Sequence, residues 1–213
     1  FPESHAASFA LLVYASCWIK CHHPAEFLAA MLNSQPLGFY SASQLVQDAK
    51  RHGVEVRRVD VMSSEWDCTL EGLPHPPAVR LGLRLVVGLK AESALRILKA
   101  RRERPFDGAD DLARRAEIDQ PPSTAQAWPL TLLAAADALM SVAGHRRQQV
   151  WEAAGQRSAP QLLKQAPVNE EELELPAAPE GEEVVWDYAA TGLTLRRHPL
   201  AILRPVLAKQ GWC

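Results

Sequence analysis

Glycine and proline cut this chain of 213 residues into short segments, and their placement constrains the fold more than any other feature. A helix capped by Ser4 must end before Pro24, because the residue that precedes a proline avoids helical backbone angles. Proline suits the first turn of a helix, so a second helix is expected over residues 25–32. A third is expected from a cap at Ser43 to Gly53, a residue type that commonly ends helices. The first helix is apolar on nearly every side, so we expect it to be buried.

The hydrophobic period changes in the middle of the chain. Apolar and polar residues alternate over residues 54–61 and again over residues 79–85. Alternation of this kind is typical of strands with one buried face. Two short strands are therefore predicted, and the proline-rich stretch between them is expected to be a loop.

A helical period returns after Gly88 and continues to about Gly155, with breaks expected at Pro105 and at residues 121–122. Residues 156–183 are rich in Pro, Ala and Glu and show no period, which is typical of a solvated linker. The sequence thus predicts a mainly α fold with a few short strands.

The sharpest local signal lies in residues 85–101. An apolar run enters a tight turn at Gly88, and an amphipathic helix leaves that turn. This is the layout of a helix-hairpin-helix, in which backbone N–H groups at the start of the second helix bind a phosphate oxygen. Such a contact reads no bases, so it predicts duplex binding without sequence preference. The helix is expected to turn Ala94, Leu95, Ile97 and Leu98 inward and Arg96, Lys99, Arg101 and Arg102 outward.

Lys90 stands where the usual hairpin has a second glycine. If that position needs a positive φ, a residue other than glycine costs roughly 1–2 kcal/mol. The lysine ammonium could offset this cost by binding the phosphate. The alternative is a distorted hairpin that only packs against the core.

A weaker second copy of the pattern follows. It consists of a helix over residues 132–140, a turn over 141–145 and a helix over 146–154. The candidate DNA contacts of the two hairpins are Gly88, Leu89, Lys90, Ala91, Lys99, Arg101, Arg102, Gly144, His145, Arg146 and Arg147.

Charge is segregated along the chain although the formal net charge is only −2. Residues 80–104 hold eight basic and two acidic side chains, whereas residues 168–188 hold eight acidic and no basic ones. The basic part indicates a polyanionic partner. The alternative is an ordinary solvated helix face.

The chain lacks the motifs of a complete active site, such as a glycine-rich phosphate loop or an Asp-x-Asp pair. Cys17 and Cys21, followed by two histidines, could form half of a metal site, but buried structural cysteine is the favoured interpretation. No metal ligand is therefore assigned. The four cysteines do not form a secreted disulfide pattern, which favours the cytoplasm, and an export signal ending at Cys17 is disfavoured because Glu3 precedes its apolar run.

Several motifs resemble bacterial C-family DNA polymerases. The opening resembles the end of the fingers domain of that family, and the later motifs resemble its error-prone branch more closely. The residues that carry the resemblance lie in segments 1–12, 18–20, 23–30, 38–41, 48–56, 59–61, 66–68, 146–148 and 191–199.

This resemblance implies that the chain is a piece of an error-prone, translesion DNA-directed DNA polymerase, a nucleotidyltransferase that acts in damage-induced mutagenesis and repair. Its metal-binding aspartates, and the Mg²⁺ they are expected to hold, would lie outside these residues. Ser4 and His5 match a pair that the family places beside the incoming nucleotide. The alternative is that Ser4 only caps a helix and His5 only packs.

The resemblance also assigns domains. It implies the end of the fingers at 1–53, a small mixed α/β region at 54–87, a tandem helix-hairpin-helix domain at 88–155, an acidic flexible linker at 156–186 and a helical lead-in to an oligonucleotide-binding domain at 187–213. The expected partners are primer–template duplex, the incoming deoxynucleotide, accessory mutagenesis proteins and the sliding clamp, although the linker shows no convincing clamp-binding peptide. The competing hypotheses are a stand-alone helix-hairpin-helix protein that binds nucleic acid and a module that docks another protein.

Overall fold

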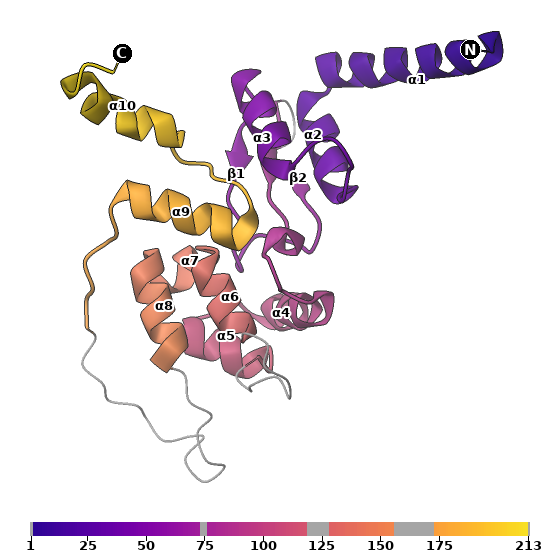
Figure 1. The fold of residues 1–213 in the computed structure, drawn as a ribbon. Helices are drawn as coiled ribbons and strands as arrows, with labels where there is room; N and C mark the ends of the chain where they lie inside the picture. The colour runs from indigo at the N-terminus through magenta and orange to yellow at the C-terminus, as the bar shows by residue number, and fades with distance from the viewer. Residues whose placement is uncertain (1, 73–75, 119–127, 156–172, 213) are drawn as a thin grey trace. The chain divides into compact units, whose positions relative to one another are not determined.

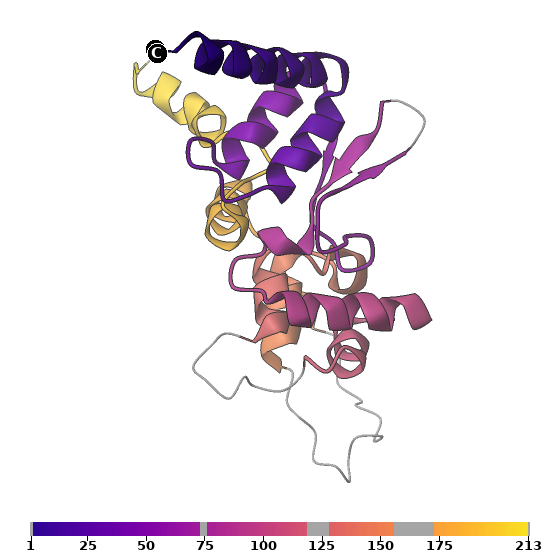
Figure 2. The same cartoon turned by 90° about the vertical axis from the view of Figure 1, so that its right-hand side faces the viewer.

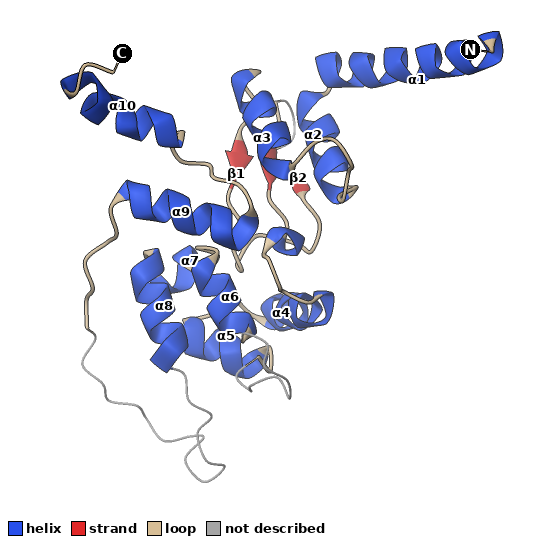
Figure 3. Ribbon diagram, viewed as in Figure 1, coloured by secondary structure: helices blue, strands red, loops and turns tan. Residues whose placement is uncertain are grey.

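A computed structural model describes residues 2–72, 76–118, 128–155 and 173–212. The chain divides into two compact units (Figure 1). Unit 1 comprises Phe1–Arg57 and Asp67–Leu81, and unit 2 comprises Arg58–Trp66 and Gly82–Cys213. Most of the described residues are helical and only a few form strands (Figure 3), which confirms the predicted fold class.

Unit 1 begins with three helices, α1 (Glu3–His22), α2 (Pro24–Asn33) and α3 (Ala42–Arg51). Pro24 is the first residue of α2, as its fixed φ favours. The cap of α3 is Ser41 and not Ser43, because the Ser41 hydroxyl accepts from the backbone N–H of Gln44 while the Gln44 side chain accepts from the Ser41 N–H. This capping box starts the helix earlier than the sequence predicted.

Helix α1 differs from expectation in two respects. It begins at Glu3 with Pro2 as its N-cap, so Ser4 does not cap it. None of its residues is buried, whereas the sequence predicted a buried helix. Figure 2 shows α1 at the upper ends of α2 and α3. Its exposed large apolar side chains are Phe9, Leu11, Leu12, Val13, Tyr14, Trp18 and Ile19.

A small sheet completes unit 1. Its strands β1 (Val56–Arg57), β2 (Thr69–Glu71) and β3 (Ala78–Arg80) lie in the order β1-β3-β2. The central β3 pairs in parallel with β1 and antiparallel with β2. Both predicted strands are shorter than expected: β1 covers only two of residues 54–61, and residues Leu83–Leu85 form a 3₁₀ turn, η1, in place of the end of the second strand. The alternation of apolar and polar residues did not predict β2, whose residues are all half-buried.

Unit 2 is helical, and its helices are α4 (Ala91–Glu103), α5 (Ala109–Arg115), α6 (Pro129–Ala135), α7 (Met140–Ala143), α8 (Arg146–Gly155), α9 (Glu180–Thr191) and α10 (Pro199–Lys209). Their shared core contains Ile97, Leu112, Leu130, Leu133 and Leu139, all fully buried. The break expected at Pro105 is present between α4 and α5, whereas the one expected at residues 121–122 lies outside the described residues.

Two predictions for unit 2 are wrong in part. The helix predicted over 132–140 is interrupted by a turn in which Asp137 has a φ of 58°. The linker predicted over 156–186 does not extend that far, because Glu180 starts α9 with three acidic residues in its first turn. Carboxylates there interact favourably with the helix dipole. Residues 156–172 of the predicted linker are not described.

Candidate nucleic-acid interface

The turn between η1 and α4 forms the first hairpin. The Leu89 N–H donates to the Val86 carbonyl over 3.1 Å, and Gly88 at the third position of this turn has a φ of 83°. This is a type II turn, which favours glycine at that position. Leu89 is buried and anchors the turn in the core of unit 2.

Lys90 has the ordinary extended angles φ −83° and ψ 144°, so the strain that a missing glycine could have caused does not arise. Lys90 is the N-cap of α4, and no side chain accepts from the first N–H groups of this helix. Both Lys90 and Ala91 are exposed. The start of α4 thus presents backbone N–H groups and an ammonium group on the surface, a combination that favours an anion.

The faces of α4 follow the predicted period with two exceptions. Ala94, Ile97 and Leu98 are buried, whereas Leu95 lies outward and is 60% exposed. Lys99 and Arg102 are exposed. The second exception is Arg101, which was predicted to face outward.

Arg101 holds a loop of unit 2. Its guanidinium donates to the carbonyls of Val61 (3.0 Å) and Ser64 (2.6 Å) and forms an ion pair with Glu65. The side chain is only 13% exposed. Arg101 therefore stabilises the fold and is not presented to a ligand, contrary to the prediction that it contacts DNA.

The second hairpin joins α7 to α8 through Gly144. Its φ of 69° and ψ of −142° lie in a region that is essentially restricted to glycine. The ring of His145 is bound on both sides, since Nε2 lies 2.7 Å from the Leu175 carbonyl and Nδ1 accepts from the Gln148 N–H. His145 thus caps α8 and holds residue 175, and its ring is not available as a DNA contact in this arrangement.

The two arginines that begin α8 have different surroundings. The side chain of Arg146 is 2% exposed and forms ion pairs with Glu183 and Asp187 of α9. Arg147 is 35% exposed and forms an ion pair with Glu182 over 2.8 Å. Arg146 was predicted to reach DNA, but it is an internal link between α8 and α9, whereas Arg147 remains on the surface.

Arg146 belongs to a partly buried ionic network that the sequence pattern did not predict. The network contains three arginines and three carboxylates, so its charges balance, and its interior position requires such pairing. Glu183 and Asp187 are four residues apart on α9, and this spacing, which places them on one helix face, was the available signal. The members are Arg58, Asp137, Arg146, Glu183, Asp187 and Arg196.

Ser4 and His5, the predicted nucleotide contacts, both lie on exposed surface of α1. The carbonyl of Ser4 accepts from the Ser8 hydroxyl, and the His5 ring packs edge-on against Phe9 with centroids 4.5 Å apart. The two residues are adjacent on the first turn of α1.

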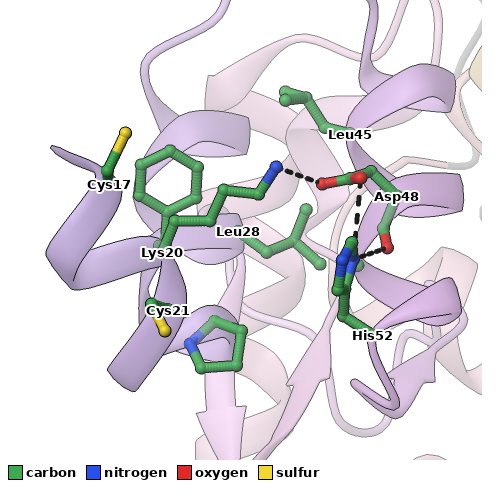
Figure 4. Close-up of a pocket in the computed structure, with 10 residues that line it drawn as sticks. Cys17, Lys20, Cys21, Leu28, Leu45, Asp48 and His52 are labelled. Atoms are coloured by element: carbon green, nitrogen blue, oxygen red, sulfur yellow. Dashed lines mark hydrogen bonds and ion pairs between the residues drawn. The ribbon is translucent and has the colours of Figure 1, made fainter. Parts of the chain in front are cut away.

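Unit 1 also contains a pocket of about 400 Å³ between α1, α2 and α3 (Figure 4). Lys20 lies at its edge and binds Asp48 over 2.7 Å, and this hydrogen bond holds the pKa of the Asp48 carboxyl below its usual value. Cys17 and Cys21 line the pocket and are both exposed, so the expectation of buried structural cysteines is wrong. Within the described ranges, no three Cys, His, Asp or Glu side chains gather in a way that could hold a metal ion. No helix in the described part of the chain has the length and apolar character to cross a membrane.

Comparisons with known proteins fit the two hairpins. The family model of the helix-hairpin-helix motif matches residues 53–149, which include both glycine turns. Proteins named error-prone DNA polymerase match almost the whole chain. The protein of Aromatoleum aromaticum is 55% identical over 97% of this chain, that of Azoarcus sp. is 54% identical over 98%, and that of Methylococcus capsulatus is 49% identical over all of it.

These matches cover only 19%, 20% and 21% of the three relatives, respectively. The chain therefore spans about a fifth of the length of the curated relatives it matches. The resemblance found in its motifs is confirmed: the chain is homologous, over nearly all its length, to one segment of the proteins named error-prone DNA polymerase.

Proposed function

We propose that the chain is the duplex-holding segment of an error-prone, translesion DNA polymerase. The observation that carries this proposal is the first hairpin, where a type II turn at Gly88 leads into a helix whose first N–H groups have no side-chain cap. Homology to error-prone polymerases and the helix-hairpin-helix match support DNA as the ligand.

The proposed contact is narrower than the sequence predicted. It consists of the backbone at Gly88, Lys90 and Ala91, with the side chains of Lys90, Lys99 and Arg102 around it. Leu89 anchors the turn from inside. At the second hairpin, the proposed contact consists of the backbone after Gly144 and the side chain of Arg147. Three of the predicted contacts, Arg101 in α4 and His145 and Arg146 at the start of α8, support the fold instead.

DNA synthesis, a nucleotidyl transfer, is proposed for the longer protein and not for this segment alone. That chemistry uses divalent metal ions, expected to be Mg²⁺, held by converging carboxylates. The described residues do not fit such a site, because buried carboxylates such as Asp111, Asp137 and Glu183 bind arginines. The metal ligands are therefore assigned to the rest of the protein.

Ser4 and His5 are proposed to form one wall of the nucleotide pocket, on the basis of the resemblance and their exposure on α1. Replacing both by alanine is expected to raise the KM for the incoming deoxynucleotide and to leave duplex affinity unchanged. An unchanged KM would remove this assignment.

The remaining proposals concern the longer protein and rest on the homology to error-prone DNA polymerases. They are a role in DNA repair and damage-induced mutagenesis, a cytoplasmic location, and contact with accessory mutagenesis proteins or the sliding clamp. The hypothesis of a module that docks another protein is less favoured, because Arg146 of α8 and Asp187 of the acidic segment bind each other within this chain.

Duplex affinity measured as a function of salt tests the main proposal. In the full-length protein, Lys90→Ala with Arg102→Ala is expected to weaken binding equally for all sequences and to reduce the salt slope by about 0.9 for each phosphate that is no longer neutralised. Lys209→Ala, which removes an exposed charge from α10, is the control. An unchanged affinity and slope in the double variant would refute the DNA contact at the first hairpin.

A further inference from the structure

Gln149 holds both ends of the short helix α7. Its side-chain amide is fully buried. The oxygen Oε1 accepts from the Leu139 N–H before α7, and Nε2 donates to the Gly144 carbonyl after it, over 2.6 Å. One side chain from α8 therefore fixes the start of α7 and the turn that follows it.

The same amide is tied to a carboxylate. Gln149 Nε2 donates to Oδ1 of Asp137 over 2.8 Å, so both amide hydrogens have acceptors. The other oxygen of Asp137 accepts from Arg58 (3.1 Å) and from Arg196 (3.0 Å). The position of Gln149 thus depends on a buried carboxylate that Arg196 helps to neutralise.

Arg196 connects this carboxylate to α9. Its guanidinium binds Glu183 over 2.8 Å and approaches Asp187 to 3.3 Å. Both of these carboxylates also bind Arg146, which begins α8 two residues after Gly144. These contacts form a closed ring that starts and ends beside the Gly144 turn. Its members, in order, are Gln149, Asp137, Arg196, the carboxylates Glu183 and Asp187, and Arg146.

We propose that Gln149 and Arg196 are positioning residues that hold the Gly144 turn in its DNA-binding conformation. This proposal rests on the function proposed above. The turn needs such support because glycine adopts many backbone conformations at similar cost, so the surroundings of Gly144 must select the observed one. The ring is suited to this role because a buried ionic network is stable only when all its members are paired.

Neighbouring arginines provide a matched control. Arg196 is 26% exposed and lies in the ring, whereas Arg197 is 64% exposed and pairs only at the surface with Glu180. Arg196→Met and Arg197→Met remove the same charge from adjacent positions, so a general effect of charge on DNA affinity is expected to be similar in both.

The experiment uses the full-length protein and a labelled duplex of mixed sequence. Arg196→Met and Gln149→Met are expected to speed amide hydrogen exchange over residues 139–150 and to weaken duplex binding about tenfold, the factor that corresponds to one charge-assisted hydrogen bond. Arg197→Met is expected to leave exchange unchanged and affinity within about twofold. Arg196→Lys, which retains the charge but not the forked geometry, is expected to give intermediate values in both measurements.

The two readouts must change together if the ring positions the turn. A loss of affinity in Arg197→Met equal to that in Arg196→Met would overturn the proposal, and so would faster exchange in the ring variants without weaker binding. If Arg196→Met does not fold, Gln149→Met and Arg196→Lys decide the question. The DNA-binding proposal itself fails separately, through wild-type affinity of the Lys90→Ala, Arg102→Ala variant, and the exchange data then still show whether the ring fixes the turn.

Discussion

Replacing Arg101 by methionine removes three interactions that hold the loop containing Val61, Ser64 and Glu65. Hydrogen bonds to a charged group contribute about 1.5–3 kcal/mol each. Glu65 is 41% exposed and regains water when its partner is removed, so the two carbonyls account for most of the effect. We expect local opening of the loop to become easier by about 3 kcal/mol, which corresponds to a factor of about a hundred.

Native-state hydrogen exchange in the full-length protein measures this change in the peptide that covers residues 58–66. The same variant is expected to leave the salt slope of duplex binding unchanged, since Arg101 does not reach the surface contact. Arg102→Met is the matched control, because it removes the same charge from the next residue of α4. It is expected to lower the slope by about 0.9 and to leave exchange in the loop unchanged.

The reasoning is refuted if Arg101→Met reduces the salt slope as much as Arg102→Met does, or if exchange in residues 58–66 stays at the wild-type rate. The first result would mean that Arg101 contacts phosphate, as the charge pattern of the sequence alone predicted. The second would mean that other interactions hold the loop.

Two further predictions concern the hairpin glycines and a carboxylate. Asparagine tolerates the third position of a type II turn, so Gly88→Asn is expected to retain most duplex affinity. Gly144→Asn is expected to cost about 1–3 kcal/mol in local stability, measured by exchange over residues 139–150, and to weaken duplex binding more than Gly88→Asn does. Equal duplex affinities of the two variants would contradict the assigned backbone angles. A hydrogen bond from Arg80 lowers the pKa of Glu71, although burial opposes this shift, so the stabilisation from Glu71 is complete above its ordinary pKa of about 4.3 and is lost as the pH falls through the lowered value. Amide hydrogen exchange in the small sheet, corrected for the intrinsic rate, is expected to become faster in that acidic range in the wild type. Glu71→Gln is expected to make the exchange rate depend less on pH. A variant with the wild-type pH profile would show that Glu71 does not stabilise the sheet.

Local rules were sufficient for features that depend on neighbouring residues. The glycine turn at Gly88, the helix that starts at Pro24 and the break at Pro105 were all predicted, because each follows from the backbone preferences of one or two residues. The cap of α3 was placed two residues late, since two serines near its start could serve equally well and only the side chain of Gln44 distinguishes them.

Features that depend on distant partners were not predictable in this way. Among the described residues, Arg101 and Arg102, Arg146 and Arg147, and Arg196 and Arg197 are adjacent arginines of which the first is bound to carboxylates and clearly more buried, whereas in Arg114 and Arg115 the second is the more buried. The partners of the inner arginines lie far away in sequence, such as Glu65 for Arg101 and Asp187 for Arg146. Composition and periodicity show that a segment is basic, but they do not show which arginine meets a carboxylate, so the candidate DNA contacts included residues that stabilise the fold.

If the proposed function holds, the exposed cations at the two hairpins need to give only weak DNA binding. With a handful of phosphate contacts, a protein binds DNA non-specifically with a Kd of roughly 10⁻⁴ to 10⁻⁶ M at physiological salt. Such affinity is weak for a separate protein, but a segment joined to a domain already on the template acts at an effective concentration on the order of mM. The chain spans about a fifth of the length of its relatives, which fits a segment of this kind. Because backbone amides and surface cations bind phosphates without reading bases, the proposed contact would hold a duplex of any sequence.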